Sequence, residues 1–268
     1  MLTLLLVVAA VAAPAASSPA ADPVLGGAAH AIEQGRLEQG RLMIAQAIRS
    51  GYKGPPVERL LADLAFASHK YDEALGRYQS LTAAGVRDSV LCQRGAISAL
   101  ELGRLSEAQP LAECAVASPT ASWRAWNARA VVADLTQDWA MADKCYGRAL
   151  QLAPGEGEIV NNQGWSLLLR GDWSGALPRF EKAAALKPKS ARIANNLELT
   201  KSALAADLPR RRTEESDSDW AGRLNDAGVA AQLLGDNKRA LAAFTRALEA
   251  NSVWYERAAD NLERMSGK

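Results

Sequence analysis

The chain has 268 residues, of which 49% are hydrophobic and 23% are charged, and its formal net charge is +1. These values indicate a folded protein and exclude a disordered or collagen-like chain. A near-neutral charge supplies no basic surface of the kind that nucleic acid requires, so we expect no nucleic-acid partner. Tyrosine and phenylalanine, which favour strands, number only 5 and 3. Together with the abundant alanine, this scarcity predicts an all-α protein.

The N-terminus begins with an apolar run from Leu2 to Ala13, and small residues and prolines follow it. The run is too short to cross a bilayer, and the small residues stand where a signal peptidase would cut. We therefore predict that 1–20 is a cleavable signal peptide and that the protein is exported to the periplasm or envelope. No Lys or Arg precedes the run, and a disordered alanine-rich tail is the alternative. No cysteine follows the run, so a lipid anchor is not expected. A transmembrane span is not expected either, because the run is too short.

Three cysteines, Cys92, Cys114 and Cys145, are widely spaced, and neither of the two histidines lies near one of them. Metal sites need clustered ligands, so no metal site is predicted. Cysteines without such clustering are typically small buried hydrophobic residues. In an exported chain a disulfide such as Cys92–Cys114 is the alternative, which the spacing alone does not establish.

The most informative pattern is a repeat of 34 residues. Five repeats follow one another without an insertion and a sixth comes later, at 21–54, 55–88, 89–122, 123–156, 157–190 and 221–254. The eighth position of each repeat is small: Ala28, Ala62, Ala96, Ala130, Gly164 and Gly228. The twentieth position is small too: Gly40, Ala74, Ala108, Ala142, Ala176 and Ala240. Such regularity indicates two antiparallel helices that cross closely at these positions.

Other positions complete this helix–turn–helix module. Position fifteen is often glycine, as in Gly103 and Gly171, which suits a turn with positive φ. Position twenty-four carries a large residue, such as Tyr146 or Phe180, to fill the space beside the crossing. Each module needs neighbours to bury its remaining apolar face.

The repeat phase breaks once, at 191–220. A first helix begins there, but Glu198 stands at the small position, and the charged run RRRTEESDSD follows from Arg210 to Asp219. We interpret 191–220 as a degenerate helix plus a solvated charged linker. Residues 255–268 are predicted to form a capping helix that covers the last repeat.

On these residues the chain resembles tetratricopeptide repeat proteins, over about 21–254. The resemblance implies an all-α solenoid with a right-handed superhelix and a groove lined by the first helix of each repeat. Projected onto this sequence, the groove contains Arg59, Asp63, Phe66, Gln93, Arg124, Asn127, Asn161, Asn162, Trp165, Asn195, Asn196 and Asn225.

Asparagine recurs in this groove. A carboxamide has one acceptor and two donors, so a row of asparagines could hold an extended peptide backbone while aromatic residues anchor it. The alternative is that these asparagines are helix caps.

Nothing in the sequence predicts catalysis, since no acid–base or nucleophile cluster and no phosphate-binding loop is present. We therefore expect a non-enzymatic scaffold without a cofactor, whose partner is a protein or an extended peptide. Residues 190–262 also resemble the tetratricopeptide protein of bacterial tight-adherence (Flp) pilus assembly, which implies an outer-membrane secretin as partner and a role in assembling or localising it. The alternatives are a general adaptor that docks a folded partner and a regulatory subunit of an envelope enzyme.

Overall fold

The computed structural model of the chain describes residues 22–205, 208–250 and 255–265. In these ranges every regular element is an α-helix, and no strand occurs. Two compact units make up the chain, an N-terminal unit that ends at Ala121 and a C-terminal unit that begins at Ser122. The predicted signal peptide, 1–20, lies outside the described residues.

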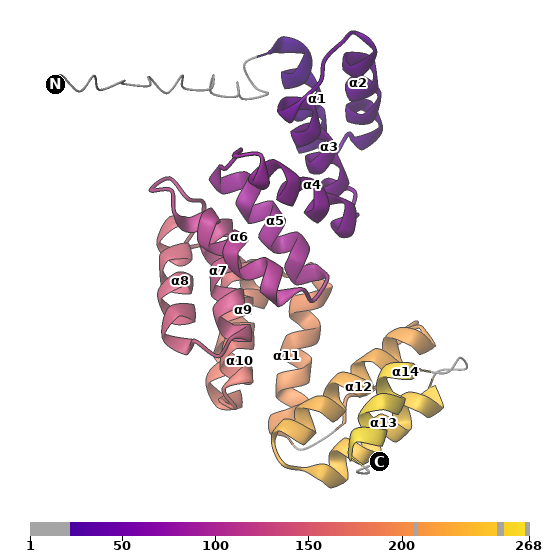
Figure 1. Cartoon of the computed structure of the whole chain (residues 1–268). Helices are drawn as coiled ribbons and strands as arrows, with labels where there is room; N and C mark the ends of the chain where they lie inside the picture. Colours follow the sequence, from indigo (N-terminus) through magenta and orange to yellow (C-terminus); the bar gives the residue numbers. More distant parts are fainter. Residues whose placement is uncertain (1–21, 206–207, 251–254, 266–268) are drawn as a thin grey trace, which may run out of the picture. The chain divides into compact units, whose positions relative to one another are not determined.

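The N-terminal unit consists of three pairs of consecutive helices (Figure 1). The pairs are α1 (Pro23–Glu33) with α2 (Leu37–Arg49), α3 (Pro55–Ala67) with α4 (Tyr71–Ala83), and α5 (Ser89–Glu101) with α6 (Leu105–Val116). The first helices also pack on one another, α1 on α3 and α3 on α5. In each unit, we call the surface that the first helices of the pairs form together the first-helix face.

The C-terminal unit continues the pattern and then interrupts it. Its helices are α7 (Trp123–Leu135), α8 (Trp139–Leu152), α9 (Gly157–Leu169), α10 (Trp173–Leu186), α11 (Ala191–Leu204), α12 (Asp217–Leu233), α13 (Asn237–Ala250) and α14 (Glu256–Met265). Helix α11 packs on α9, α10 and α12 but has no second helix of its own. Helix α12 begins four residues before the predicted repeat at 221, because Ser216 caps an additional N-terminal turn with its side chain.

The turns inside the repeats share one backbone conformation. Position fifteen has a φ between 57° and 81° in all six repeats: Gly35, His69, Gly103, Gln137, Gly171 and Gly235. This left-handed conformation is easy for glycine and uncommon for other residues. His69 and Gln137 adopt it as well, which shows that packing of the two helices overrides local preference there.

The helix crossings explain the small residues. Every alanine at positions eight and twenty is fully buried. A Cβ atom added to Gly164 would lie 2.8 Å from the Phe180 ring, and one added to Gly228 would lie 2.5 Å from the Phe244 ring. The large residue at position twenty-four therefore fills the space that the small residue leaves.

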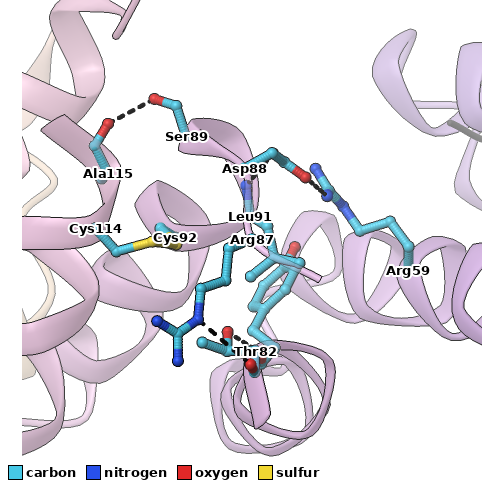
Figure 2. The surroundings of a disulfide bond; sticks show 10 residues. Arg59, Thr82, Arg87, Asp88, Ser89, Leu91, Cys92, Cys114 and Ala115 are labelled. Carbon is cyan, nitrogen blue, oxygen red and sulfur yellow. Dashed lines mark hydrogen bonds and ion pairs between the residues drawn. A yellow bond between two sulfur atoms is a disulfide. The ribbon is translucent and has the colours of Figure 1, made fainter. Parts of the chain in front are cut away.

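A disulfide joins Cys92 on α5 to Cys114 on α6, with 5.7 Å between their Cα atoms (Figure 2). The third repeat is thus closed covalently across its two helices. Beside it, the Ser89 hydroxyl donates to the backbone carbonyl of Ala115 at 2.6 Å. Cys145 is a free buried cysteine, as expected of a small hydrophobic residue. Burial raises the pKa of its thiol.

Candidate functional site

The predicted groove asparagines of the C-terminal unit lie together on α7, α9 and α11. Asn162 Nδ2 donates to Asn127 Oδ1 at 3.2 Å, and Asn196 Nδ2 donates to Asn161 Oδ1 at 2.9 Å. Within α9, Asn161 Nδ2 donates to Asn162 Oδ1 at 3.2 Å. These bonds form a continuous amide row across the three helices α7, α9 and α11.

The row has a simple geometric cause. Its inter-repeat partners are 35 residues apart, so position six of one repeat reaches back to position five of the repeat before it. In the pair Asn161–Asn162, the Asn162 amide therefore bonds to the preceding helix α7, and the Asn161 amide bonds to the following helix α11. Part of the hydrogen-bonding capacity that we assigned to a peptide is used inside the protein.

Burial corrects three of the predicted groove residues. Asn161 is 2% exposed, Asn225 is 0% exposed and Gln93 is 7% exposed, so a partner does not reach these side chains. Asn225 Oδ1 accepts a hydrogen bond from Asn261 Nδ2 of α14 at 2.9 Å. Asn225 thus ties the closing helix to the last repeat.

The interpretation of the asparagines as helix caps is also wrong. Asn127, Asn161 and Asn195 are each the fifth residue of their helix. The N-cap side chains belong instead to Ser122, Glu156 and Ser190. Asn127 and Asn161 instead bond to the next helix of the row, and Asn195 accepts from Arg212.

In the N-terminal unit the predicted groove residues form an ion-pair cluster. Asp63 lies between two guanidinium groups, 3.0 Å from Arg59 Nε and 2.7 Å from Arg94 Nη1. The Tyr78 hydroxyl donates to Asp63 Oδ1 at 2.7 Å. Burial, reinforced by the Asp63 charge, raises the pKa of Tyr78. Arg59 also pairs with Asp88 at 2.6 Å (Figure 2).

Most of this charged cluster is enclosed. The side chains of Arg59 and Asp63 are 14% and 13% exposed, and that of Arg94 is 22% exposed. The Arg94 guanidinium also lies over the Phe66 ring, 5.8 Å from its centroid. The charges of this region therefore satisfy one another.

Two predicted residues remain open to solvent in the C-terminal unit. Trp165 on α9 is 43% exposed, and it is the one aromatic residue among the exposed large hydrophobic residues in the described part of the chain. Arg124 on α7 is exposed and lies over the Trp123 ring, 4.3 Å from its centroid.

Trp165 borders a surface pocket, which is lined by Trp165, Asn195, Asn196, Glu198, Leu199, Pro209, Arg223 and Asp226. An exposed aromatic residue beside a mixed polar and apolar pocket is the usual composition of a binding anchor.

The charged run after α11 is largely exposed, as expected of a solvated segment, but part of it docks on this site. We call residues 208–216 the strap. Arg212 of the strap donates from Nη1 to Asn195 Oδ1 at 3.0 Å and forms an ion pair with Glu198. Arg223 of α12 pairs with the same Glu198 and, at 2.7 Å, with Glu215 of the strap. Charged side chains on α11 and α12 thus hold the strap.

The two ends of this network differ in exposure. The side chains of Arg223 and Glu215 are 9% and 6% exposed, whereas that of Arg212 is 43% exposed. Removing one partner of a buried ion pair typically costs about 3–5 kcal/mol, and an exposed pair contributes about 0.2–1 kcal/mol. Burial by itself would raise the pKa of Glu215, but the Arg212 backbone N–H and the Arg223 guanidinium outweigh it and lower that pKa.

Sequence reasoning missed most of this network. Glu198 was identified only as a misfit at a small position, and Arg223 and Arg94 were not identified at all. Arg94 does carry a signal, because it stands at position six, where Asn162 and Asn196 also reach back to the preceding repeat. The strap carries no comparable signal, since it lies outside the repeat.

The described residues contain no cluster of His, Cys, Asp or Glu that could hold a metal ion. Among the same residues, no helix is both long and apolar enough to cross a membrane.

Repeat geometry, small crossings and positive-φ turns define an all-α tetratricopeptide-type protein, which confirms the predicted fold class. Residues 136–191 match the family model for the tetratricopeptide repeat. Proteins built from this repeat bind protein partners and are generally non-catalytic.

Solved structures share this fold at low sequence identity. A tetratricopeptide repeat protein from Parabacteroides merdae has a TM-score of 0.57 at 15% identity, with 91% of this chain and 97% of that chain covered. PilW, a widely conserved type IV pilus biogenesis factor, has a TM-score of 0.52 at 16% identity, with 88% and 96% covered. The Cut9–Hcn1 hetero-tetramer of the APC/C has a TM-score of 0.54 at 13% identity, with 90% and 48% covered. No curated protein matches the sequence.

Proposed function

We propose that this protein is an exported, non-catalytic scaffold of the bacterial cell envelope. In this proposal it holds a segment of a partner protein on the first-helix face of its C-terminal unit and assists the assembly or localisation of a pilus or secretion complex. The observation that carries the proposal is the exposed Trp165 beside the pocket on α9, α11 and α12.

Chemistry at this face favours a partner segment over a small molecule. The amide row leads from Asn127 through Asn162 to Asn196, which itself lines the pocket. Trp165 then supplies a large apolar anchor at low conformational cost. A chain segment that lies along the row can pair with amide groups and place one side chain at the pocket.

Export is supported by two independent features. The apolar run from Leu2 to Ala13 has the length of the apolar region of a signal peptide, and small residues follow it. The disulfide between Cys92 and Cys114 belongs to the kind of crosslink that persists in oxidising compartments such as the periplasm.

The pilus or secretion role rests on the resemblance of residues 190–262 to the tight-adherence pilus assembly protein. PilW shares the fold with this chain and is itself a pilus biogenesis factor, which is compatible with that role. An outer-membrane secretin is the partner that the resemblance implies.

Photo-crosslinking tests where the partner binds. A photoreactive residue replaces Trp165 in one variant and Leu152 in the other, because Leu152 of the second helix α8 is 44% exposed, close to the 43% of Trp165. We expect a partner adduct from position 165 and none from position 152. Mass spectrometry of the adduct should identify a secretin or another pilus-assembly component.

Adducts from position 152 alone would contradict the first-helix face as the binding site. They would support the alternative of a general adaptor that docks a folded partner on the second helices. An adduct with an envelope enzyme would support the regulatory-subunit alternative.

Export has its own test. N-terminal sequencing of the mature protein should find a start between Ala16 and Asp22, and thiol labelling should detect Cys145 only after denaturation. An intact Met1 in a protein whose three cysteines are all free thiols would contradict export.

A further inference from the structure

We propose that the half-buried surface of α11 at Asn195 and Glu198 is a receptor for an arginine side chain of the partner segment, and that Arg212 of the strap occupies it as an internal substitute. This inference rests on the proposed function, because it names the chemistry of the partner that the first-helix face would bind.

The receptor already shows a guanidinium in place. Arg212 Nη1 donates to Asn195 Oδ1 at 3.0 Å, and Arg212 Nη2 forms an ion pair with Glu198. Asn195 and Glu198 are three residues apart on α11, so their side chains lie on the same side of the helix. An amide oxygen and a carboxylate at this spacing match the planar fork of donors that arginine presents.

Charge selects arginine over an acidic side chain. When the Arg212 side chain moves away, the pocket keeps two carboxylates, Glu198 and Asp226, of which Asp226 lies 4.0 Å from the guanidinium of Arg257. Its remaining cation, Arg223, is already paired with Glu198 and with the buried Glu215. An incoming carboxylate would therefore meet like charges, whereas a guanidinium would restore the pairing that Arg212 gives up.

The strap can release Arg212 without leaving its place. Glu215 and Arg223 anchor one part of it through a buried ion pair, and Arg223 Nη2 also donates to the Arg210 carbonyl at 3.0 Å. The Arg212 side chain is 43% exposed and contributes only a surface ion pair and a hydrogen bond. Exchange of one side chain is therefore easier than displacement of the segment.

Apolar residues complete the receptor. Trp165, Leu199 and Pro209 line the same pocket as Asn195 and Glu198. The indole face of Trp165 can receive the aliphatic stem or the cation of an arginine. Partner segments that combine a guanidinium with a neighbouring apolar residue suit this composition best.

The test uses the full mature chain and a capped synthetic peptide with the sequence of residues 208–213, LPRRRT. A second peptide has Gln at the residue that corresponds to Arg212, and a third has Glu there. Binding is followed by the NMR signal of the Trp165 indole N–H, which a Trp165→Phe variant assigns. The proteins are the wild type, Arg212→Ala and the matched control Arg211→Ala. The Arg211 side chain is 48% exposed, and its partners are Asp217 and the Glu215 carbonyl rather than Asn195 or Glu198.

We expect Arg212→Ala to bind the LPRRRT peptide at least about threefold more tightly than the wild type or Arg211→Ala, which is the scale of one exposed ion pair. The Gln peptide should bind Arg212→Ala at least about threefold less tightly, and the Glu peptide less tightly still. Added salt should weaken the binding of the arginine peptide. Equal affinities of Arg212→Ala and Arg211→Ala, or of the arginine and Gln peptides, would overturn the proposal.

A further variant addresses the receptor itself. Adding Glu198→Gln to Arg212→Ala should abolish the preference for the arginine peptide, while unchanged amide signals of α9 verify that the fold is intact. A retained preference would overturn the assignment of Glu198. Arginine-selective binding to Arg212→Ala without a crosslink at position 165 would support this inference and contradict the proposed function. A crosslink at position 165 without any preference for the arginine peptide would support the proposed function and overturn this inference.

Discussion

The two units use the same repeat position in different chemical forms. In the N-terminal unit, position six is Arg94, which reaches back to Asp63 of the preceding repeat at 2.7 Å. In the C-terminal unit, position six is Asn162 and then Asn196, which reach back to Asn127 and Asn161. The repeat thus determines which helices a side chain joins, whereas the residue type determines whether the joint is ionic or neutral.

This difference bears on function. The charged joint of the N-terminal unit satisfies its groups internally, since Asp63 accepts from two arginines and from Tyr78. The amide row of the C-terminal unit ends at Asn196, which lines an open pocket beside Trp165. A neutral joint leaves polar groups at a surface without a large desolvation cost, so it suits a binding face better than enclosed charges do.

The largest effect is expected from breaking the ionic joint. Asp63→Ala leaves Arg59, Arg94 and the Tyr78 hydroxyl without their shared acceptor. Because these groups are mostly buried, we expect the free energy of unfolding to fall by about 3 kcal/mol, the lower end for a buried ion pair. Asp72→Ala is the control, because the Asp72 side chain is 73% exposed in its pair with Arg104. Chemical denaturation that gives equal losses would show that the joint is not a buried one.

The disulfide adds a covalent joint to the N-terminal unit only. Replacing both Cys92 and Cys114 by Ala opens a loop with a sequence separation of 22 residues. Loss of that constraint on the unfolded chain should lower stability by about 3 kcal/mol. Hydrogen exchange should show the loss in α5 and α6. A reducing agent should destabilise the wild type and leave the double variant unchanged, and an equal response of both would refute the crosslink.

Breaking the neutral joint should have an intermediate effect. Asn161→Ala removes the acceptor for Asn196 and the donor to Asn162, and each such hydrogen bond contributes about 0.5–1.5 kcal/mol. We expect a loss of about 1–2 kcal/mol that hardly depends on salt, in contrast to Asp63→Ala. Asn195→Ala, whose partner Arg212 is exposed, should change stability by less than about 0.5 kcal/mol. A larger loss of stability from Asn195→Ala than from Asn161→Ala would contradict the structural role of the amide row at Asn161.

The smallest effect concerns the acid response of the strap. The pKa of Glu215 is lowered from its ordinary 4.5 in the folded protein, so its contribution to stability is present above about pH 4.5 and is lost as the pH falls through the folded pKa. Glu215→Gln keeps a polar side chain beside Arg223, and Arg223 stays paired with Glu198, so the variant should be only somewhat less stable than the wild type at pH 7. It should also lose less stability between pH 5 and pH 3. Thermal melts at several pH values measure this difference. Parallel curves would show that Glu215 is not ionised in the network.

Much of the fold follows from periodicity along the chain. A small residue every 34 positions can be read without a structure because close helix crossings exclude larger side chains there, as the Phe180 ring does at Gly164. Positions five and six were correctly assigned to first helices for the same reason. Their contacts were not predicted, because the position of a residue on a helix does not reveal which neighbouring side chain forms hydrogen bonds with it.

The sequence by itself determined the class of the protein, the pairing of its helices and the place where the repeat breaks, since these depend on periodic small and large residues. Only the tertiary structure decided that Asn161 and Asn225 are enclosed, that the asparagines join repeats and do not cap helices, and that the strap docks on Glu198. The physical reason is that a run of charged residues is usually solvated. Whether such a run docks on the fold depends on partner residues far along the chain, which the local sequence does not show. Arg223 and Glu198, 25 residues apart, show this dependence, because they pair only when α11 and α12 come together.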